Sequence, residues 1–426
     1  MQKSDYKIHI VGTGVSGLIA AQVLEKHGYS PTIIEATNTV GGRVKTDIVE
    51  GYQLDHGFQV LLNAYPAAKK YLDFEKLELQ TLKPGATIFK NGTSQTIGDA
   101  FRDFSLFLPT LFSNVGSLSD KIKILQLNNQ LKKKKLADIF KVDEKTTHQY
   151  LLDFGFSDKI ITNFFKPFFS GIFLETNLET SSSMFEFVYK MFGEGLAVIP
   201  KNGMQGLPNQ LKENLKSTTF IFNTKVVEVF DDKIVLENNQ EIKTDFTIIA
   251  TEASHLISNL KNQEMEWKSC DCLYFTTPKR VLQKPIIGLI ADEKALINNI
   301  FYNTSIATST KGKEELLSVT VVKNHNLSEQ DLVKKVSQEL NDYCKIDDVN
   351  FLKRYQIKKA LPNLTNVQYE LSSTETKLKE TIFLAGDQLL NGSLNAAMVT
   401  GERAAMGVIQ TLEDGLIVDE LTSEYK

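Results

Sequence analysis

The chain has 426 residues, of which 42% are hydrophobic and 23% charged, and its formal net charge is −4. This length and composition are typical of a soluble globular protein with two or three domains and a sizeable core. Because no excess of basic residues creates an attractive field, we expect no nucleic-acid partner.

The first predicted elements form a strand–helix–strand unit. Residues 7–11 have the apolar run of a buried strand, residues 15–27 have the apolar spacing of a helix, and residues 31–35 form a second strand. Gly28 is well placed to cap the end of the helix. In such a unit, a glycine-rich loop between the first strand and the helix can bind a dinucleotide.

That loop has the pattern G-x-G-x-x-G, formed by Gly12, Gly14 and Gly17. Gly12 permits a tight turn, Gly14 lets the backbone approach a diphosphate, and Gly17 allows close contact between helix and strand. The helix dipole and the unpaired N–H groups then face the phosphates. Glu35 is placed to bind a ribose and to disfavour the 2′-phosphate of NADP. The motif alone leaves three interpretations open: a nicotinamide dinucleotide, a flavin, or a tight turn without a ligand.

The next part of the chain has a different character. Residues 60–195 are predicted to be mostly helical with loops, and the segment 151–173 contains seven Phe residues. This Phe cluster has two interpretations: a packed helical core, or an apolar tunnel for a hydrophobic substrate with residues 101–112 as a surface-seeking lip. The basic run at 132–135 is then either a solvated helix face or a contact for anionic lipid head groups.

Strands dominate the prediction after residue 219. Residues 219–251 form several strands, and residues 267–377 add more strands together with a helix at 329–341. Residues 381–387 form a strand that ends in Gly-Asp, and a helix follows at 395–412. Because we find no internal repeat and no long linker, we expect the domains to be interleaved along the chain.

A second glycine-rich segment follows the first unit. After Glu35 come Ala36, four further residues, and then Gly41, Gly42 and Arg43. The glycine pair lets the chain pass beside a ligand, and the arginine can meet a phosphate or the negative charge of a reduced flavin. Behind a G-x-G-x-x-G motif, this pattern resembles the flavin-containing amine oxidase superfamily, which includes protoporphyrinogen oxidases and phytoene-desaturase-like enzymes.

Three further segments carry the same resemblance over nearly the whole chain. Residues 200–211 resemble the family's Gly-Met-x-x-Leu segment, residues 223–253 resemble the strand pair that follows it, and residues 383–405 resemble the terminal Ala-Gly-Asp motif with its helix. The resemblance implies that the backbone of Val226 contacts adenine and that Asp387 binds the ribityl or diphosphate region. It also implies that the last helix points its N-terminus at the flavin pyrimidine oxygen, where it would stabilise negative charge.

Motifs and resemblance together predict the cofactor and the residues that hold it. The cofactor is FAD, bound without a covalent bond, because the region before Ala397 lacks the Cys that the amine-oxidase branch often uses. No metal is expected, since the pair Cys270 and Cys272 has no neighbouring His or Cys and is interpreted as packing thiols. The predicted cofactor contacts are Gly12, Gly14, Val15, Ser16, Gly17, Glu35, Ala36, Gly41, Gly42, Arg43, Gly57, Phe58, Val226, Ala250, Gly386, Asp387, Leu394, Asn395 and Ala396.

The resemblance also implies the fold class, which is α/β. It consists of a Rossmann-like, GR2-type FAD-binding domain and an interleaved α+β substrate domain with a mixed sheet plus helices. We assign residues 1–62, 197–266 and 378–426 to the FAD-binding domain, and residues 63–196 and 267–377 to the substrate-binding domain. The two ends of the chain and a middle segment would therefore build one domain.

Two residues are candidates for a catalytic role beside the flavin. His56 lies in a segment that is near the flavin in the family, so it could hydrogen-bond the flavin or the substrate; the alternative is a structural histidine bonded to backbone. Tyr355 is a candidate for the aromatic side chain that flanks the substrate amine in the amine-oxidase branch. Residues 360–362, Ala-Leu-Pro, resemble the desaturase and protoporphyrinogen-oxidase branch instead, which argues against a simple amine substrate.

The expected function is that of an FAD-dependent oxidoreductase. It would transfer a hydride to the flavin from a C–N or C–C bond of a small apolar or amine substrate. The alternatives are a desaturase- or isomerase-type flavoenzyme that uses a quinone or another acceptor, and a non-catalytic flavin-bound scaffold. Only three cysteines and no apolar leader before the first motif predict a cytoplasmic protein, with peripheral contact at the inner face of a membrane as an open alternative.

Overall fold

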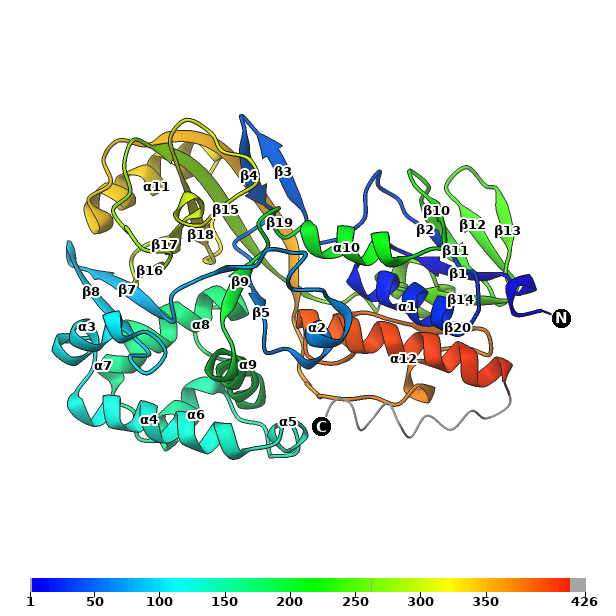
Figure 1. The fold of residues 1–426 in the computed structure, drawn as a ribbon, viewed down its shortest axis with the longest axis horizontal. Coiled ribbons are helices and arrows are strands. Elements are labelled where there is room, and N and C mark those ends of the chain that lie inside the picture. Colours follow the sequence, from blue (N-terminus) through cyan, green and yellow to red (C-terminus); the bar gives the residue numbers. More distant parts are fainter. Residues whose placement is uncertain (1, 262, 414–426) are drawn as a thin grey trace.

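The computed structural model describes residues 2–261 and 263–413. Residues 1, 262 and 414–426, which the sequence analysis assigned to the FAD-binding domain, lie outside the described part. Figure 1 shows a parallel sheet with its helices on one side of the molecule, a second sheet on the other, and a layer of helices below that second sheet. Within the described residues, we find no helix with both the length and the apolar character needed to cross a bilayer.

The parallel sheet has five strands in the order β10-β2-β1-β14-β20. All its neighbouring strands pair in parallel, so their carboxyl ends meet at one edge, where ligands bind in open α/β sheets. The strands are short, and β1, β2, β14 and β20 are largely buried, whereas β10 is exposed or half-buried. One face of the sheet packs against helices, and the other face packs against a cluster around Val226, Ile234 and Leu236. Their bounds are β1 Ile8–Val11, β2 Thr32–Ile34, β10 Thr219–Ile221, β14 Phe246–Ile249 and β20 Ile382–Leu384.

Helix α1 (Val15–Lys26) follows β1 directly and packs along helix α12 (Leu394–Leu412), the last described helix. The two helices approach very closely, since a Cβ added at Gly401 would lie 2.2 Å from the carbonyl oxygen of Ser16. The predicted bounds of both helices are confirmed to within one residue. Their contact fixes the start of α1 beside the start of α12, and both helix starts face the same cavity.

The second sheet has seven strands in the order β19-β15-β18-β17-β16-β7-β8. Neighbouring strands pair antiparallel, except that β16 and β7 run parallel. Helix α11 (Glu329–Cys344) buries its apolar face against this sheet. The strands are β7 Gly85–Lys90, β8 Thr93–Gly98, β15 Trp267–Thr277, β16 Ile287–Ile290, β17 Ile297–Tyr302, β18 Glu315–Val321 and β19 Asn350–Pro362.

The hairpin of β7 and β8 corrects the sequence analysis, which expected residues 60–195 to be mostly helical. Residues 85–98 form two paired strands joined at Asn91 and Gly92, which have φ angles of 51° and 70°. Two consecutive residues with positive φ are typical of a type I′ turn, and Asn-Gly is a favoured sequence for it. The hairpin therefore extends the second sheet with a segment far away in the sequence.

Most of the remaining helices form the layer below the second sheet (Figure 1). The Phe cluster belongs to it and includes a π-helical turn, Ile161–Phe165. Three small sheets complete the fold: β3 (Thr46–Val49) with β4 (Tyr52–Asp55); β5 (Leu61–Leu62), β9 (Ala197–Ile199) and β6 (Gln80–Thr81); and β11 (Val226–Val229), β12 (Lys233–Leu236) and β13 (Glu241–Lys243). The other helices are α2 Pro66–Tyr71, α3 Phe107–Phe112, α4 Leu118–Lys133, α5 Leu136–Ile139, α6 Thr147–Asp153, α7 Asp158–Ile160, α8 Lys166–Phe173, α9 Ser182–Glu194 and α10 Gly206–Asn214. The predicted mixed α/β class is confirmed.

Candidate flavin site

One large cavity runs from the parallel sheet to the helical layer. Its volume is about 1670 Å³, well above the about 300–1,000 Å³ typical of a site for one small molecule. The carboxyl ends of β1, β2 and β14 form one end of the cavity, and residues of α4, α8 and α9 form the other. The cavity is therefore large enough for a dinucleotide and a second molecule beside it.

The glycine-rich loop leaves space where a diphosphate would lie. Gly14 is the N-cap of α1, and no side chain caps this helix, so N–H groups of its first turn lack a side-chain acceptor and can donate to a ligand. A Cβ added at Gly14 would meet no atom within 4 Å, whereas one at Gly17 would lie 2.1 Å from the carbonyl oxygen of Gly12. Gly14 thus faces open space and Gly17 faces backbone, which fits the expected roles of both glycines.

Glu35 at the end of β2 is held in a network of four hydrogen bonds. The backbone N–H and the hydroxyl of Thr13 donate to Oε2 at 2.9 and 2.6 Å, and those of Thr37 donate to Oε1 at 2.8 Å each. Burial acts to raise the pKa of Glu35, but these bonds outweigh it and lower the pKa below the usual value. The Thr37 hydroxyl also lies 3.0 Å from the carbonyl oxygen of Thr39. Because it carries one hydrogen, it can turn to Thr39 and free Oε1 for a ribose hydroxyl.

Arg43 connects the second glycine segment to the far end of the chain. Its guanidinium forms an ion pair with Asp387, donates to the carbonyl oxygen of Ala360 at 3.1 Å, and lies 5.2 Å from the ring centroid of Trp267. The Asp387 side chain is only 6% exposed, so its charge needs this partner. Arg43 therefore neutralises the charge of the Asp387 carboxylate, which lines the same cavity as the start of α1.

The geometry of this end of the cavity fits an FAD-type dinucleotide, and sequence comparison agrees with it. Residues 15–409 match a protein family described as flavin containing amine oxidoreductase. The chain belongs to this family. The match confirms the predicted resemblance, and it makes FAD the cofactor and oxidoreduction the enzyme class.

Individual relatives are distant. Protoporphyrinogen oxidase 2 of Arabidopsis thaliana is 27% identical over 39% of this chain and 32% of its own length, and an L-amino-acid oxidase of Bothrops moojeni is 28% identical over 35% and 32%. The chain thus aligns with about a third of the length of these curated relatives. The solved structure of cyclohexylamine oxidase from Brevibacterium oxydans covers 96% of this chain and 99% of its own, with a TM-score of 0.70 and 13% identity. That likeness supports the flavin-family fold.

Most residues predicted to contact FAD line the cavity. Those in its wall are Gly12, Gly14, Val15, Ser16, Glu35, Ala36, Gly41, Gly42, Arg43, Gly57, Phe58, Val226, Ala250, Gly386, Asp387 and Leu394. They come from segments far apart in the sequence, which the parallel sheet and the α1–α12 contact bring together. Their contacts with FAD stay predictions.

Three predicted residues lie behind the cavity wall. Gly17 packs against the Gly12 backbone. Asn395 is buried, and its Oδ1 accepts a hydrogen bond from the N–H of Ala67 at 3.0 Å. The N–H of Ala396 donates to the hydroxyl of Ser393 at 3.0 Å, so the N-cap of α12 already uses it. A flavin oxygen near this helix would therefore be served by the N–H groups before Ala396.

The sequence analysis missed several residues of the site. Ser393 is the N-cap of α12 and lines the cavity; a Ser directly before an apolar helix is a recognisable cap signal. Thr13, inside the glycine motif, holds Glu35. Trp267 lies at the Arg43 guanidinium, and no sequence signal indicates this, because the two side chains meet only through the tertiary fold.

His56 and Tyr355, the two candidates for catalysis, belong to one cluster at the cavity wall. Their rings lie 4.4 Å apart between centroids, and both donate to the same oxygen, Oδ2 of Asp47, at 2.9 and 2.7 Å. Burial, followed by the bond to Asp47, raises the pKa of Tyr355 well above its usual value. Burial acts to raise the pKa of Asp47 as well, but the bonds from Tyr355 and His56 lower it. Tyr355 is therefore a neutral donor, and Asp47 is a carboxylate.

We expect Tyr355→Phe to reduce stability in a pH-dependent way. At pH 7 the lost hydrogen bond to Asp47 lowers the free energy of unfolding by about 1 kcal/mol. A lowered pKa in the folded state stabilises the protein above the unfolded pKa, near 3.9, and this contribution disappears as the pH falls through the folded value. The difference between variant and parent should thus shrink below about pH 4. Urea unfolding at several pH values measures it.

Tyr65→Phe is the matched control for this change. Tyr65 lines the same cavity, and we find no hydrogen-bond partner of its hydroxyl among the described residues. Because this replacement removes no hydrogen bond, it should change the free energy of unfolding by less than about 0.5 kcal/mol. An equal loss in both variants, or a loss for Tyr355→Phe that does not change with pH, would contradict the role of the bond to Asp47.

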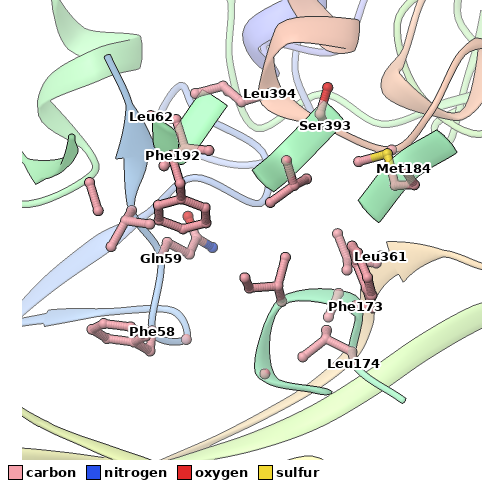
Figure 2. Close-up of a pocket in the computed structure, with 18 of the residues that line it drawn as sticks. Phe58, Gln59, Leu62, Phe173, Leu174, Met184, Phe192, Leu361, Ser393 and Leu394 are labelled. Atoms are coloured by element: carbon pink, nitrogen blue, oxygen red, sulfur yellow. The ribbon is translucent and has the colours of Figure 1, made fainter. Parts of the chain in front are cut away.

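The far end of the cavity is apolar. Figure 2 shows Leu62, Met184 and Phe192 facing one space, with Gln59 as a polar group among them. Phe58, a predicted FAD contact, borders the same space. The π-helical turn places Phe164 in the wall while Phe165 is buried. Both interpretations of the Phe cluster are therefore partly correct: its inner residues form core, and others line the cavity.

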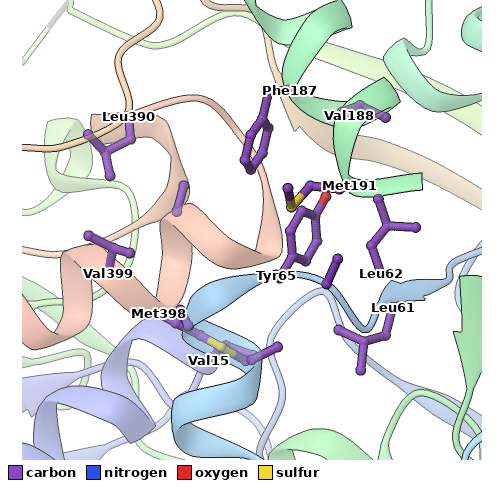
Figure 3. Close-up of a cluster of buried hydrophobic side chains, with 14 of the residues drawn as sticks. Val15, Leu61, Leu62, Tyr65, Phe187, Val188, Met191, Leu390, Met398 and Val399 are labelled. Atoms are coloured by element: carbon purple, nitrogen blue, oxygen red, sulfur yellow. The ribbon is translucent and has the colours of Figure 1, made fainter. Parts of the chain in front are cut away.

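Behind this wall, a buried hydrophobic cluster connects the flavin end to the helical layer. Figure 3 shows Tyr65, Phe187 and Met398 packed together. The rings of Tyr65 and Phe187 are stacked with centroids 5.7 Å apart. Since Met398 belongs to α12 and Phe187 to α9, this core fixes the apolar wall relative to the predicted flavin position.

All four acidic residues among the described wall residues already have partners. Glu35 accepts from Thr13 and Thr37, Asp387 pairs with Arg43, Glu252 with Lys359, and Asp99 with Arg102. At the far end, the pKa of Lys268 is lowered by burial, and its ammonium donates to the Thr180 hydroxyl at 3.2 Å. The apolar end thus offers no unpaired carboxylate to an ammonium group.

Proposed function

We propose that this protein uses FAD to oxidise a C–N or C–C bond of an apolar substrate that binds in the far end of the cavity. The carrying observation is one continuous cavity, with the predicted cofactor residues at one end and apolar side chains at the other. The paired state of every acidic wall residue supports an apolar substrate over a polyamine. A carboxylate would be needed to hold a second ammonium group in such a pocket.

We further propose a GR2-type, Rossmann-like FAD-binding domain formed by residues 1–62, 197–266 and 378–426. The composition of the sheets supports this division. All five strands of the parallel sheet come from these segments, and all seven strands of the second sheet come from 63–196 and 267–377. The catalytic site would then lie between the two parts, as is common for cofactor enzymes.

We propose the following contacts between the chain and FAD. The free N–H groups at the start of α1 would bind the diphosphate, Glu35 the ribose, and the pair of Arg43 and Asp387 the region between diphosphate and flavin. When bound, FAD accepts the hydride that leaves the substrate. Phe164, Phe192 and their apolar neighbours would exclude water from the reacting end.

We propose that the FAD is held without a covalent bond. Cys270 lines the cavity, but burial raises the pKa of its thiol to about 12, so it has little thiolate at neutral pH. Cys272 and Cys344 are buried away from the wall. Acid precipitation should therefore release all yellow colour into the supernatant.

For His56 and Tyr355 we propose a positioning role. The Tyr355 hydroxyl and the His56 Nε2 both donate hydrogen bonds to Asp47. These bonds hold His56 in place and would thereby fix the adjacent turn that contains Gly57. Gly57 lines the cavity with φ of 100°, and a Cβ there would lie 2.9 Å from the Cδ1 of Ile357. We find no such bond to Nδ1 of His56 within the described residues, so a proton transfer with the substrate at this atom is the competing role.

The function is tested by anaerobic bleaching of the flavin. We expect an apolar porphyrinogen, polyene or hydrophobic amine to bleach the yellow protein, and the diamine putrescine to bleach it at least about tenfold more slowly, since its second ammonium would lack a partner. Stopped-flow absorbance measures the rates. Fast bleaching by putrescine would exclude an apolar substrate class, and a flavin that no donor reduces would favour the non-catalytic scaffold.

The electron acceptor separates the two remaining enzyme classes. Release of hydrogen peroxide during aerobic turnover would identify an oxidase. Inertness in air together with turnover on a quinone would identify the desaturase- or isomerase-type alternative.

A further inference from the structure

A cluster of exposed apolar side chains lies at the mouth of the cavity, on the segment that precedes the short helix α3, on α3 itself and at the start of α4. We call it the apolar lip and define it as Phe101, Phe104, Leu108, Phe112, Leu118, Ile122 and Leu125. Phe101, Phe104 and Phe112 are 87, 82 and 78% exposed. Helix α3 has the sequence FLPTLF and contains no buried residue. Helices of globular proteins normally bury an apolar stripe against the core. Helix α3 has apolar side chains but buries none of its residues, which is typical of a surface that binds another molecule.

Helix α4 continues the lip with a regular pattern. Leu118, Ile122 and Leu125 are 69, 51 and 43% exposed and follow one another at i, i+4 and i+7 on one face. Lys132 lies on the same face further along the helix and is exposed. The face that α4 turns outward is therefore apolar at its start and basic at its end.

The charges around the lip are mostly positive, in contrast to the negative chain as a whole. Residues 101–135 contain seven basic residues and two acidic ones. Two of the seven, Arg102 and Lys134, pair with Asp99 and Glu186, which lie outside this segment. Of the two acids, Asp103 pairs with Lys83, and Asp120 is buried under hydrogen bonds from serines. Lys121 donates to two backbone carbonyls, which leaves its positive charge without a carboxylate partner.

The lip is continuous with the cavity. Phe101, Phe104 and Ile122 also line the cavity wall, together with Phe107 and Leu111 of α3. A molecule that reached the lip would therefore meet an unbroken apolar path inward. This path matters only if the proposed apolar substrate is correct, whereas the exposed lip and its charges do not depend on it.

We propose that the apolar lip docks on the surface of an anionic lipid bilayer. Exposed Phe and Leu side chains would enter the boundary between head groups and acyl chains, and the basic end of α4 would face the anionic head groups. A second copy of the chain is a poorer occupant, because two lips brought together by a twofold axis would bring their positive charges together. The cavity mouth would then open toward the bilayer.

Co-sedimentation of the FAD-loaded protein with vesicles tests the docking. We expect binding to vesicles of equal parts phosphatidylglycerol and phosphatidylcholine at low salt, and weaker binding to phosphatidylcholine alone or at high salt. The combined variant Phe104→Ser and Phe112→Ser should bind at least about tenfold more weakly to both vesicle types. The combined variant Lys132→Gln and Lys133→Gln should lose roughly fivefold in binding affinity per lysine, and only on anionic vesicles.

Ile48→Ser and Phe351→Ser are matched controls, since both replace exposed apolar side chains outside the lip. They should bind vesicles like the parent. No sedimentation at low salt, or sedimentation unchanged by the Phe variant, would overturn the proposal. It would also be overturned by a dimer in analytical ultracentrifugation that the Phe variant abolishes, because the second copy would then be the occupant. Flavin bleaching by a soluble donor is measured without vesicles, so failure of the proposed function appears separately.

Discussion

Gly14→Ala is expected to weaken FAD binding by about 5- to 150-fold while leaving the apoprotein as stable as the parent. Gly14 has φ of −62° and ψ of 171°, which alanine adopts without strain. Its Cβ would meet no protein atom within 4 Å, so the folded chain has room for it. That room is the space in front of the free N–H groups of α1, where the diphosphate would lie. Titration of the apoprotein with FAD, followed by flavin fluorescence, measures the affinity.

Gly17→Ala provides the contrast, because it is the same chemical change three residues later. Its Cβ would lie 2.1 Å from the Gly12 carbonyl oxygen and 3.2 Å from the Cβ of Ala250. Helix α1 must then shift away from the sheet, so the apoprotein should lose at least about 1–3 kcal/mol of unfolding free energy. Thermal unfolding of both apoproteins separates the two effects. If Gly14→Ala binds FAD like the parent, or destabilises the apoprotein as Gly17→Ala does, the diphosphate does not lie at Gly14.

The sequence predicted the parallel sheet and the cavity wall near it well, for a physical reason. The strands are short runs of mostly apolar residues, and a glycine marks the turn after two of them: Gly12 directly after β1, and Gly386 two residues after the end of β20. These signals are local, so periodicity and glycine placement reveal them. The helix bounds of α1 and α12 could be predicted for the same reason.

The parts that the sequence did not reveal depend on contacts between distant segments. The hairpin of β7 and β8 is marked locally by Asn91 and Gly92, but its strand pattern was overlooked among the helical segments around it. Asp47 gives no local signal at all: it becomes a site residue only because β19 brings Tyr355 against the β3–β4 hairpin. The candidate roles of His56 and Tyr355 could therefore be named from the sequence, while the carboxylate that holds both could not.

Arg43→Met is expected to weaken FAD binding by about 10- to 100-fold. Methionine keeps the apolar length of the side chain but removes the ion pair with Asp387 and the bond to the Ala360 carbonyl oxygen. Asp387 is then a nearly buried carboxylate without a partner, next to a ligand that itself carries two phosphate charges. Because the Arg43 side chain is 40% exposed, solvent screens part of the loss, which keeps the expected effect below that of a fully buried pair. Arg43→Lys retains the charge but cannot contact Asp387 and the Ala360 carbonyl oxygen at the same time. Its FAD affinity should therefore lie between those of the parent and Arg43→Met.

A double-mutant cycle distinguishes the loss of Arg43 from the exposure of Asp387. Asp387→Asn alone leaves Arg43 unpaired but partly solvated, so it should cost less FAD affinity than Arg43→Met. In the double variant no carboxylate remains uncompensated, and we expect it to bind FAD at least about fivefold more tightly than Arg43→Met alone. Such recovery means that Arg43 acts mainly by neutralising Asp387. If the two losses are additive, each side chain contacts FAD independently, and the ion pair is not what makes this end of the cavity able to accept a diphosphate.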